Sequence, residues 1–170
     1  GPIDVLTGDY LAELTMTILY NQKMKRGENL GYVGTFLKQF RDVAKLCNDQ
    51  KIKIVSNAGG LNPASMAAEV ENIIKELNLD LKVAYIDGDD LMPRLDELSS
   101  SGEKLKNIDK NNDLFSYEKK PLTANAYLGA WGIKEALDNG ADVVICPRVT
   151  DAAVVIGPAA WKFNWSRNDY

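Results

Sequence analysis

Four short polar segments hold most of the side chains in this sequence that could do chemistry. They are Thr7-Gly8-Asp9-Tyr10, Ser56-Asn57-Ala58-Gly59-Gly60-Leu61-Asn62, Asp87-Gly88-Asp89-Asp90 and Arg148-Val149-Thr150-Asp151. Each segment follows an apolar run that predicts a buried strand. If these strands are parallel, the segments meet outside the carboxyl ends of the strands, where open α/β sheets bind their ligands. We therefore expect one site at one edge of the sheet.

The last segment is the best candidate for ligand binding. The planar guanidinium of Arg148 could clamp a carboxylate or a phosphate, with Thr150 as a second ligand-binding candidate. Asp151 could act as a general base or could orient Arg148. The alternative is that Thr150 or Asp151 only caps the helix that follows.

The turn after the second strand is a candidate anion site. Asn57, Gly59 and Gly60 lead into a helix that begins at Asn62-Pro63, and unblocked amides at a helix N-terminus suit a phosphate or a carboxylate. The alternative is a tight turn that needs glycine for its backbone angles. The turn is neither GxGxxG nor a Walker motif, which weakens a dinucleotide-binding interpretation.

Histidine is absent from the sequence. This excludes a Ser-His-Asp site, a Cys-His site and a His-ligated zinc site within the chain. Any cofactor metal would be a divalent cation with oxygen ligands, such as Mg, Mn or Ca. Asp87, Asp89 and Asp90 are the candidate ligands. The alternative, which we favour, is that one of them caps a helix near Leu91 and the others are solvated.

Asp9 and Glu13 are like charges four residues apart near the start of a predicted helix. Such a pair is mildly unfavourable on a helix unless a cation compensates. The pair therefore predicts either a cationic neighbour such as Arg148 or a ligand, and an ordinary surface pair remains equally open.

The periodicity of apolar residues predicts alternating strands and helices. Strands are expected at 3–6, 51–55, 81–86 and 141–146, helices at 10–20, 33–47, 63–77, 91–98, 124–139 and 152–161, and polar loops at 21–31 and 99–120. Asp9 is the expected cap of the first helix and Asn62 that of the third. This order predicts an α/β fold, an open parallel sheet with helices on both faces in Rossmann-like or flavodoxin-like layering. We expect one domain over 1–170, with 99–120 as a loop or insertion.

Composition excludes several classes of protein. The 170 residues carry a net charge of −4, which argues against nucleic-acid binding. No apolar stretch approaches the ~20 residues of a membrane span, and no signal peptide is recognisable. Cys47 and Cys146 are expected to be buried thiols in a reducing compartment. The expected location is soluble and intracellular, either cytoplasmic or, in a eukaryote, the mitochondrial matrix.

Five segments, in this order, match motifs of one protein family. They are Asp4-Val5-Leu6-Thr7-Gly8-Asp9-Tyr10-Leu11-Ala12-Glu13-Leu14-Thr15, Ser56-Asn57-Ala58-Gly59-Gly60-Leu61-Asn62-Pro63, Asp87-Gly88-Asp89-Asp90-Leu91, Thr123-Ala124-Asn125-Ala126-Tyr127-Leu128-Gly129-Ala130 and Arg148-Val149-Thr150-Asp151-Ala152. Together they resemble the acyclic terpene utilisation (AtuA-type) family over nearly the whole chain except 99–120. One departure is Pro147, where glycine is expected.

The resemblance implies a metabolic context. Bacterial relatives occur with genes for the catabolism of citronellol- and geraniol-type compounds through CoA thioesters. The resemblance also implies a partial chain, because family members usually extend beyond both ends. We therefore expect an enzyme domain that acts on a small anionic or CoA-thioester substrate. Asp9 and Asp151 are its acid/base candidates, and Asn125 is a hydrogen-bonding orienter.

The competing hypothesis is a non-catalytic subunit or scaffold that has kept the fold. Such a protein would copurify with a stoichiometric partner and would tolerate Arg148→Ala and Asp151→Ala. A homo-oligomer is compatible with either hypothesis.

Overall fold

The computed structural model describes residues 2–169. Within them the chain forms a wholly parallel, four-stranded sheet in the order β1-β2-β4-β3. In chain order the elements are β1 (Val5–Gly8), α1 (Glu13–Arg26), α2 (Thr35–Gln50), β2 (Lys53–Ser56), α3 (Pro63–Glu76), β3 (Val83–Tyr85), the 3-10 helix η1 (Met92–Arg94), α4 (Leu95–Ser100), the 3-10 helix η2 (Leu114–Ser116), α5 (Trp131–Asp138), β4 (Val143–Ile145) and α6 (Ala153–Lys162).

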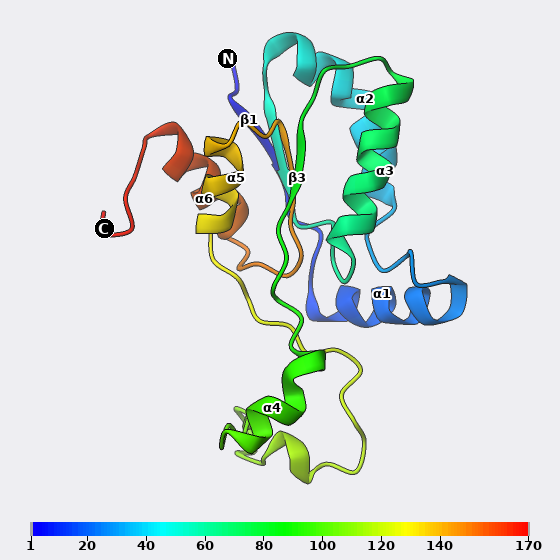
Figure 1. Ribbon diagram of the computed structural model, residues 1–170, viewed down its shortest axis with the longest axis vertical. Coiled ribbons are helices and arrows are strands. Elements are labelled where there is room, and N and C mark those ends of the chain that lie inside the picture. Colours follow the sequence, from blue (N-terminus) through cyan, green and yellow to red (C-terminus); the bar gives the residue numbers. More distant parts are fainter. Residues whose placement is uncertain (1, 170) are drawn as a thin grey trace.

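Helices cover both faces of the sheet, which confirms the predicted fold class. Figure 1 shows α2 and α3 on one face and α5 and α6 on the other. Alternate residues of each central strand therefore enter different cores. In β4, Val143 and Ile145 face α2 and α3 while Val144 faces α5 and α6. A strand buried on both faces reads as a continuous apolar run in the sequence.

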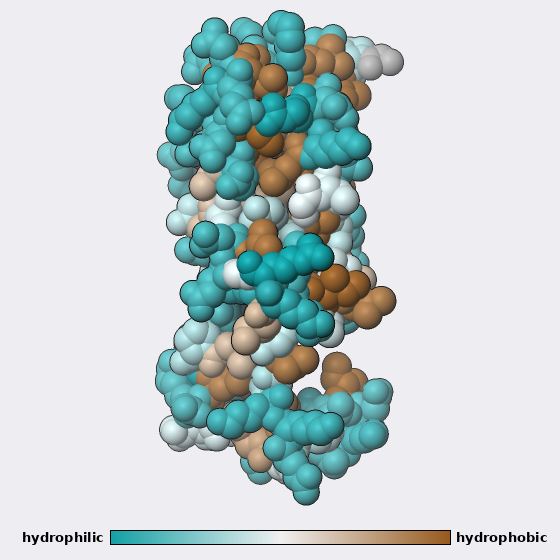
Figure 2. Space-filling model, turned by 90° about the vertical axis from the view of Figure 1, so that its right-hand side faces the viewer, coloured by the Kyte–Doolittle hydropathy of each residue, from teal (hydrophilic) through white to brown (hydrophobic). Residues whose placement is uncertain are grey.

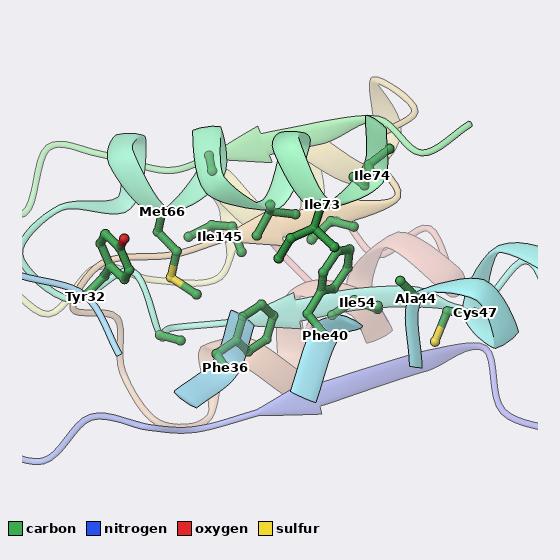
Figure 3. Close-up of a cluster of buried hydrophobic side chains, with 14 of the residues drawn as sticks. Tyr32, Phe36, Phe40, Ala44, Cys47, Ile54, Met66, Ile73, Ile74 and Ile145 are labelled. Atoms are coloured by element: carbon green, nitrogen blue, oxygen red, sulfur yellow. The ribbon is translucent and has the colours of Figure 1, made fainter. Parts of the chain in front are cut away.

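Aromatic and sulfur-containing side chains fill the core under α2 and α3. Phe36 and Phe40 of α2 stack on each other, with ring centroids 6.0 Å apart. Met66 and Ile73 of α3 close the cluster from above (Figure 3). Asn62 accepts a hydrogen bond from the Ser65 amide and Pro63 begins α3, so the predicted start of this helix is confirmed. This core holds β2 and β4 in place. We call the edge of the sheet formed by the carboxyl ends of its strands, together with the loops that follow them, the rim.

The first helix begins later and ends later than predicted. It starts at Glu13, with Ala12 rather than Asp9 at its N-cap, and it continues to Arg26 through the predicted loop. Residues 9–12 stay outside the helix because their backbone is bound elsewhere. The Tyr10 amide donates to the Asn57 side chain, and the Leu11 carbonyl accepts from Arg148.

The segment 124–130 is not helical, so α5 is shorter than predicted. Residues 124–128 run as an extended segment along the rim. Asn125 forms an antiparallel bridge with Asp90, and Leu128 forms a parallel bridge with Val149. These loops supply hydrogen-bonding partners for the backbone of the segment, so the local preference for a helix does not decide its conformation.

The segment 99–120 projects away from the sheet, below the rim in Figure 1. Residues 101–112 are all exposed. The amides of Ser101 and Glu103 donate to the carbonyls of Glu97 and Leu98 in α4, and the Leu114 amide donates to the Lys104 carbonyl. In Figure 2 the lower end of the molecule carries mainly hydrophilic side chains on this face. Among residues 2–169, no helix is both long and apolar enough to cross a membrane.

Candidate functional site

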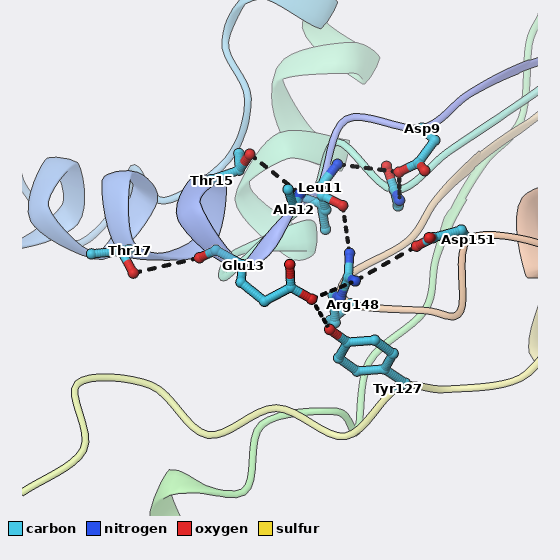
Figure 4. A network of polar contacts seen from close by, with 10 residues as sticks. Asp9, Leu11, Ala12, Glu13, Thr15, Thr17, Tyr127, Arg148 and Asp151 are labelled. Atoms are coloured by element: carbon cyan, nitrogen blue, oxygen red, sulfur yellow. Dashed lines mark hydrogen bonds and ion pairs between the residues drawn. The ribbon is translucent and has the colours of Figure 1, made fainter. Parts of the chain in front are cut away.

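Arg148 lies at the centre of the rim formed by the carboxyl ends of the strands. It follows β4, and only 4% of its side chain is exposed. Its Nη1 donates to the backbone oxygen of Leu11 at 2.6 Å, and the guanidinium carbon lies 4.1 Å from the centroid of the Tyr127 ring (Figure 4). Arg148 thus joins the loop after β1, the loop after β4 and the extended segment 124–128.

The outward nitrogen of Arg148, Nη2, faces two carboxylates without bonding closely to either. The distances to Glu13 Oε1 and Asp151 Oδ1 are both 3.6 Å, whereas charge-assisted hydrogen bonds measure about 2.7–2.9 Å. Both carboxylates are largely in solvent, since the Glu13 side chain is 82% exposed and that of Asp151 is 71% exposed. Within residues 2–169, Nη2 makes no hydrogen bond.

Glu13 has a second contact at the same oxygen. The Tyr127 hydroxyl donates a hydrogen bond to Glu13 Oε1. This bond, the backbone amide of Glu13 and then the charge of Arg148 lower the pKa of Glu13, so the group is ionised at neutral pH. The sequence predicted either a cation such as Arg148 or a ligand beside Asp9 and Glu13. In the structure Arg148 lies beside Glu13. Asp9 lies before the helix, so it forms no helical pair with Glu13.

Asn57 ties the loop after β1 to the loop after β2. It is fully buried. Its Oδ1 accepts from the Tyr10 amide at 2.7 Å, and its Nδ2 donates to Asp9 Oδ1 at 2.6 Å. Asp9 also accepts from the Leu11 amide. Asp9 thus binds the amide of Leu11 and Arg148 binds its carbonyl. Because one residue spans at most about 3.6 Å, the two side chains end close to each other. The structure therefore brings Asp9, Arg148 and Asp151 together.

Gly59 and Gly60 have packing reasons to be glycine. A Cβ on Gly59 would lie 2.6 Å from the carbonyl oxygen of Cys146, and Gly60 has a φ of +54° and lies against Leu19. The amides of residues 58–62 donate to Ser56 Oγ and to the carbonyls of Cys146, Asn57, Gly31 and Gly59 in turn. These five amides are all satisfied within the described chain, so they do not support the role of the turn in anion binding, which stays a prediction.

Asp89 is a buried carboxylate that connects three rim segments. Its Oδ2 accepts from Asn125 Nδ2 at 2.8 Å and from the Arg148 amide at 3.3 Å, and its carbonyl accepts from the Ala126 amide. Burial raises the pKa of Asp89 above its ordinary value, although these hydrogen bonds act in the opposite direction. Asn125 is therefore committed to holding Asp89, and its catalytic role stays a prediction.

The three aspartates after β3 do not form one cluster. Asp87 is exposed, Asp89 is buried, and Asp90 accepts a hydrogen bond from the Met92 amide at the start of η1. Asp90 thus binds the first amide of η1, although the N-cap residue of η1 is Leu91. The expectation that the other two are solvated holds for Asp87 and is wrong for Asp89. Among residues 2–169, no group of three or more His, Cys, Asp or Glu side chains is placed to hold a metal ion.

Asp151 and Thr150 do not cap the last helix. The N-cap of α6 is Ala152, and no side-chain cap forms there within the described residues. Asp151 instead faces Arg148. Thr150 is exposed, and its amide donates to the Leu128 carbonyl. The capping alternative is therefore wrong for both residues, and their proposed roles toward a ligand stay predictions.

Sequence reasoning missed Tyr127 as a site residue. The sequence placed Tyr127 within the helix predicted over 124–139 and gave it no role, whereas its ring covers Arg148 and its hydroxyl donates to Glu13. The only signal in the sequence that this segment belongs to the site is the family motif at 123–130.

A small apolar cavity lies elsewhere, between β1 and α2. It measures about 130 Å³ and is lined by Leu6, Tyr10, Phe36, Phe40 and neighbouring side chains. Ligand pockets are usually about 300–1,000 Å³. The lining, over the described residues, includes none of the predicted site residues, so the cavity is packing space beside an edge strand.

The fold and the rim define an α/β domain with an open parallel sheet and a polar site centred on a buried arginine at the carboxyl ends of its strands. Over residues 1–170 the chain matches the model of the acyclic terpene utilisation family protein AtuA. The chain belongs to this family, as its motifs predicted. No curated protein and no solved structure matches it.

Proposed function

We propose that this domain binds a small anionic ligand at Arg148 and that the ligand is the carboxylate or CoA thioester of a branched acid. Membership of the AtuA family supplies the context of acyclic terpene utilisation. The observation that carries the proposal is the buried guanidinium whose Nη2 lies 3.6 Å from either carboxylate.

Burial of a cation is costly unless close partners replace the lost water. Arg148 has one close partner on its side chain, the Leu11 carbonyl, and that partner is neutral. An oxyanion on Nη2 would supply the missing charge-assisted hydrogen bond. Arg148 is also placed where open α/β sheets bind their ligands, outside the carboxyl ends of adjacent strands. These features support ligand binding rather than a purely structural ion pair.

Chemistry on the bound ligand would come from the carboxylates at the same rim. Asp151 faces Arg148 at 3.6 Å and is exposed, so it can reach a ligand on Nη2. Asp9 is exposed and held by Asn57. We assign these two residues as the acid/base candidates of an enzyme domain, with Asn125 positioning Asp89 behind Arg148.

The first test is the melting temperature of the purified chain with and without CoA and 3-methylbutanoyl-CoA. A ligand at ~100 times its Kd adds about 2.7 kcal/mol to the free energy of unfolding, which is several degrees for a domain of this size. The shift should vanish in Arg148→Ala. Arg41→Ala is the matched control, because Arg41 is exposed and pairs with Glu76 on the helices α2 and α3.

Each outcome has a clear meaning. A shift in the wild type and in Arg41→Ala, but not in Arg148→Ala, supports the proposal. A shift that survives Arg148→Ala places the ligand elsewhere. No shift with either compound, in a chain that melts cooperatively, contradicts the thioester ligand and favours the non-catalytic subunit.

A further inference from the structure

Two donors converge on one oxygen atom at the rim. Glu13 Oε1 accepts the hydrogen bond of the Tyr127 hydroxyl and lies 3.6 Å from Arg148 Nη2. The Tyr127 ring also covers the guanidinium (Figure 4). A phenol and a guanidinium that point at the same place form a small oxyanion site. In this structure the oxygen that the two donors face is Oε1 of Glu13.

The N-terminus of α1 adds a third positive group. The helix has 14 residues and starts at Glu13, and its N-cap Ala12 has no side-chain acceptor. Over the described residues, no N-cap side chain therefore binds the first-turn amides of α1, and the Glu13 amide interacts with the Glu13 carboxylate itself. The positive end of the helix dipole faces the rim. Arg148 is next to this end, since it binds the Leu11 carbonyl just before it.

Tyr127 holds Glu13 in this place, and Arg148 holds it only weakly. The Glu13 side chain is 82% exposed, and its distance to Nη2 is longer than that of a charge-assisted hydrogen bond. A glutamate on the first turn can rotate into solvent without any movement of the helix. Arg148, by contrast, is buried and anchored by Leu11 and Tyr127. Arg148 is therefore the fixed donor of this group, whereas Tyr127, which is 51% exposed, and Glu13 lie at the surface.

We propose that the Glu13 carboxylate stands in for the anionic group of the ligand. On binding, a carboxylate or phosphate oxygen takes over the hydrogen bonds of Tyr127 and Arg148 Nη2, and Glu13 turns into solvent. The idea rests on the proposed function and deepens it, because it names the atoms that hold the anion and makes Glu13 an internal competitor. Removal of Glu13 therefore strengthens anion binding, whereas removal of Arg148 abolishes it.

The test measures the Kd of inorganic phosphate by calorimetric titration. Wild type is compared with Glu13→Ala, with Glu13→Ala/Arg148→Ala and with the control Glu76→Gln, which removes the same charge from an exposed carboxylate that pairs with Arg41. Glu13→Ala should lower the Kd about five-fold, the factor expected for one unit charge removed at ~4 Å in water. Glu76→Gln should leave the Kd within about two-fold, and the double variant should lose the gain.

The outcomes separate this inference from the proposed function. If Glu13→Ala binds phosphate no better than Glu76→Gln, or binds it more weakly, Glu13 does not occupy the anion site and the inference is wrong. If the double variant keeps the gain, the anion is not on Arg148. If phosphate behaves as expected while CoA and 3-methylbutanoyl-CoA do not bind, the stand-in role holds and only the thioester ligand is contradicted.

Discussion

The loops after β2 and after β4 leave neighbouring strands and lie side by side on one rim, yet they use their polar groups in opposite ways. In the loop after β2, the amides of residues 58–62 all donate within the chain, and Asn57 is buried between Tyr10 and Asp9. In the loop after β4, Arg148 is equally buried but keeps Nη2 without a hydrogen bond within residues 2–169.

The contrast between these loops shows which polar residues point to a ligand. Richness in glycine and asparagine made both loops candidates, but these residues are also what a tight, internally bonded turn requires. The informative feature is a fixed donor that its own chain does not satisfy. By that criterion the loop after β2 supports the rim, and the loop after β4 is the one that we propose binds the ligand. Four changes test this division, and the largest expected effect comes first.

Gly59→Ala should destabilise the fold strongly. The new Cβ would lie 2.6 Å from the Cys146 carbonyl and 2.9 Å from Ile145, and neither the backbone nor the buried strand can move away cheaply. We expect a loss of about 3 kcal/mol or more in the free energy of unfolding, measured in urea. Gly34→Ala is the control, because a Cβ there meets no atom of the described chain within 4 Å. Equal stability of the two variants would contradict the close packing of this turn.

Asp89→Asn should change how stability depends on pH. Burial raises the pKa of Asp89 in the folded chain above its ordinary 3.8. The folded state therefore binds the proton more tightly than the unfolded state. The contribution of Asp89 to stability is complete below its unfolded pKa and is lost as the pH rises through the folded pKa. The variant lacks this loss, so its free energy of unfolding relative to that of wild type should increase as the pH rises above 3.8.

Urea unfolding at several pH values measures this difference. Asp87→Asn is the control, since Asp87 lies two residues earlier and is exposed. A stability difference between Asp89→Asn and wild type that is flat with pH, or that falls, would show that the Asp89 carboxylate is not held in a desolvated position behind Arg148.

Arg148→Met should cost little stability while it abolishes binding. The Leu11 carbonyl loses a donor, but the buried charge is also removed, and Glu13 and Asp151 stay hydrated because they are exposed. Removal of the desolvation cost of a buried cation offsets the loss of its hydrogen bond, because no buried charge is left without a partner. We expect a change of less than about 1 kcal/mol in urea, together with loss of the CoA-dependent thermal shift. If Arg148→Met lowered the free energy of unfolding as much as Gly59→Ala, Arg148 would be a structural residue, and the two loops would not differ in role.

The sequence predicts the layers of this fold well because they depend on local patterns. Val143, Val144 and Ile145 form a continuous apolar run that becomes a strand buried on both faces, and Asn62-Pro63 starts α3 where it should. The rim also follows from the pattern, since parallel strands align their carboxyl ends. The position of Arg148 and Asp151 at one shared edge of the sheet is therefore predictable from the sequence alone.

The remaining features depend on contacts between distant segments. Residues 124–130 have an apolar spacing that suits a helix, but the loops that hold Asp90 and Val149 offer their backbone a better set of partners. Gly59 and Gly60 are fixed by Cys146 and Leu19, which no local pattern reveals. Tyr127 acquires its role only when the extended segment brings its ring over Arg148.

Replacement of residues 101–120 by a short glycine-serine linker should have the smallest effect. Residues 101–112 are exposed, and within the described chain the backbone hydrogen bonds that leave 101–120 reach only Glu97, Leu98 and Ser99 in α4. Loop length itself contributes only about 0.6 kcal/mol per doubling. We expect the free energy of unfolding to change by less than about 1 kcal/mol, with the CoA-dependent shift retained. If the shift disappears while the fold survives, residues 101–120 take part in binding. They could do so because they precede the extended segment 124–128, which contains Tyr127. The contrast between the loops after β2 and β4 would then not describe the whole site, because residues 101–120 would contribute to ligand binding together with Arg148.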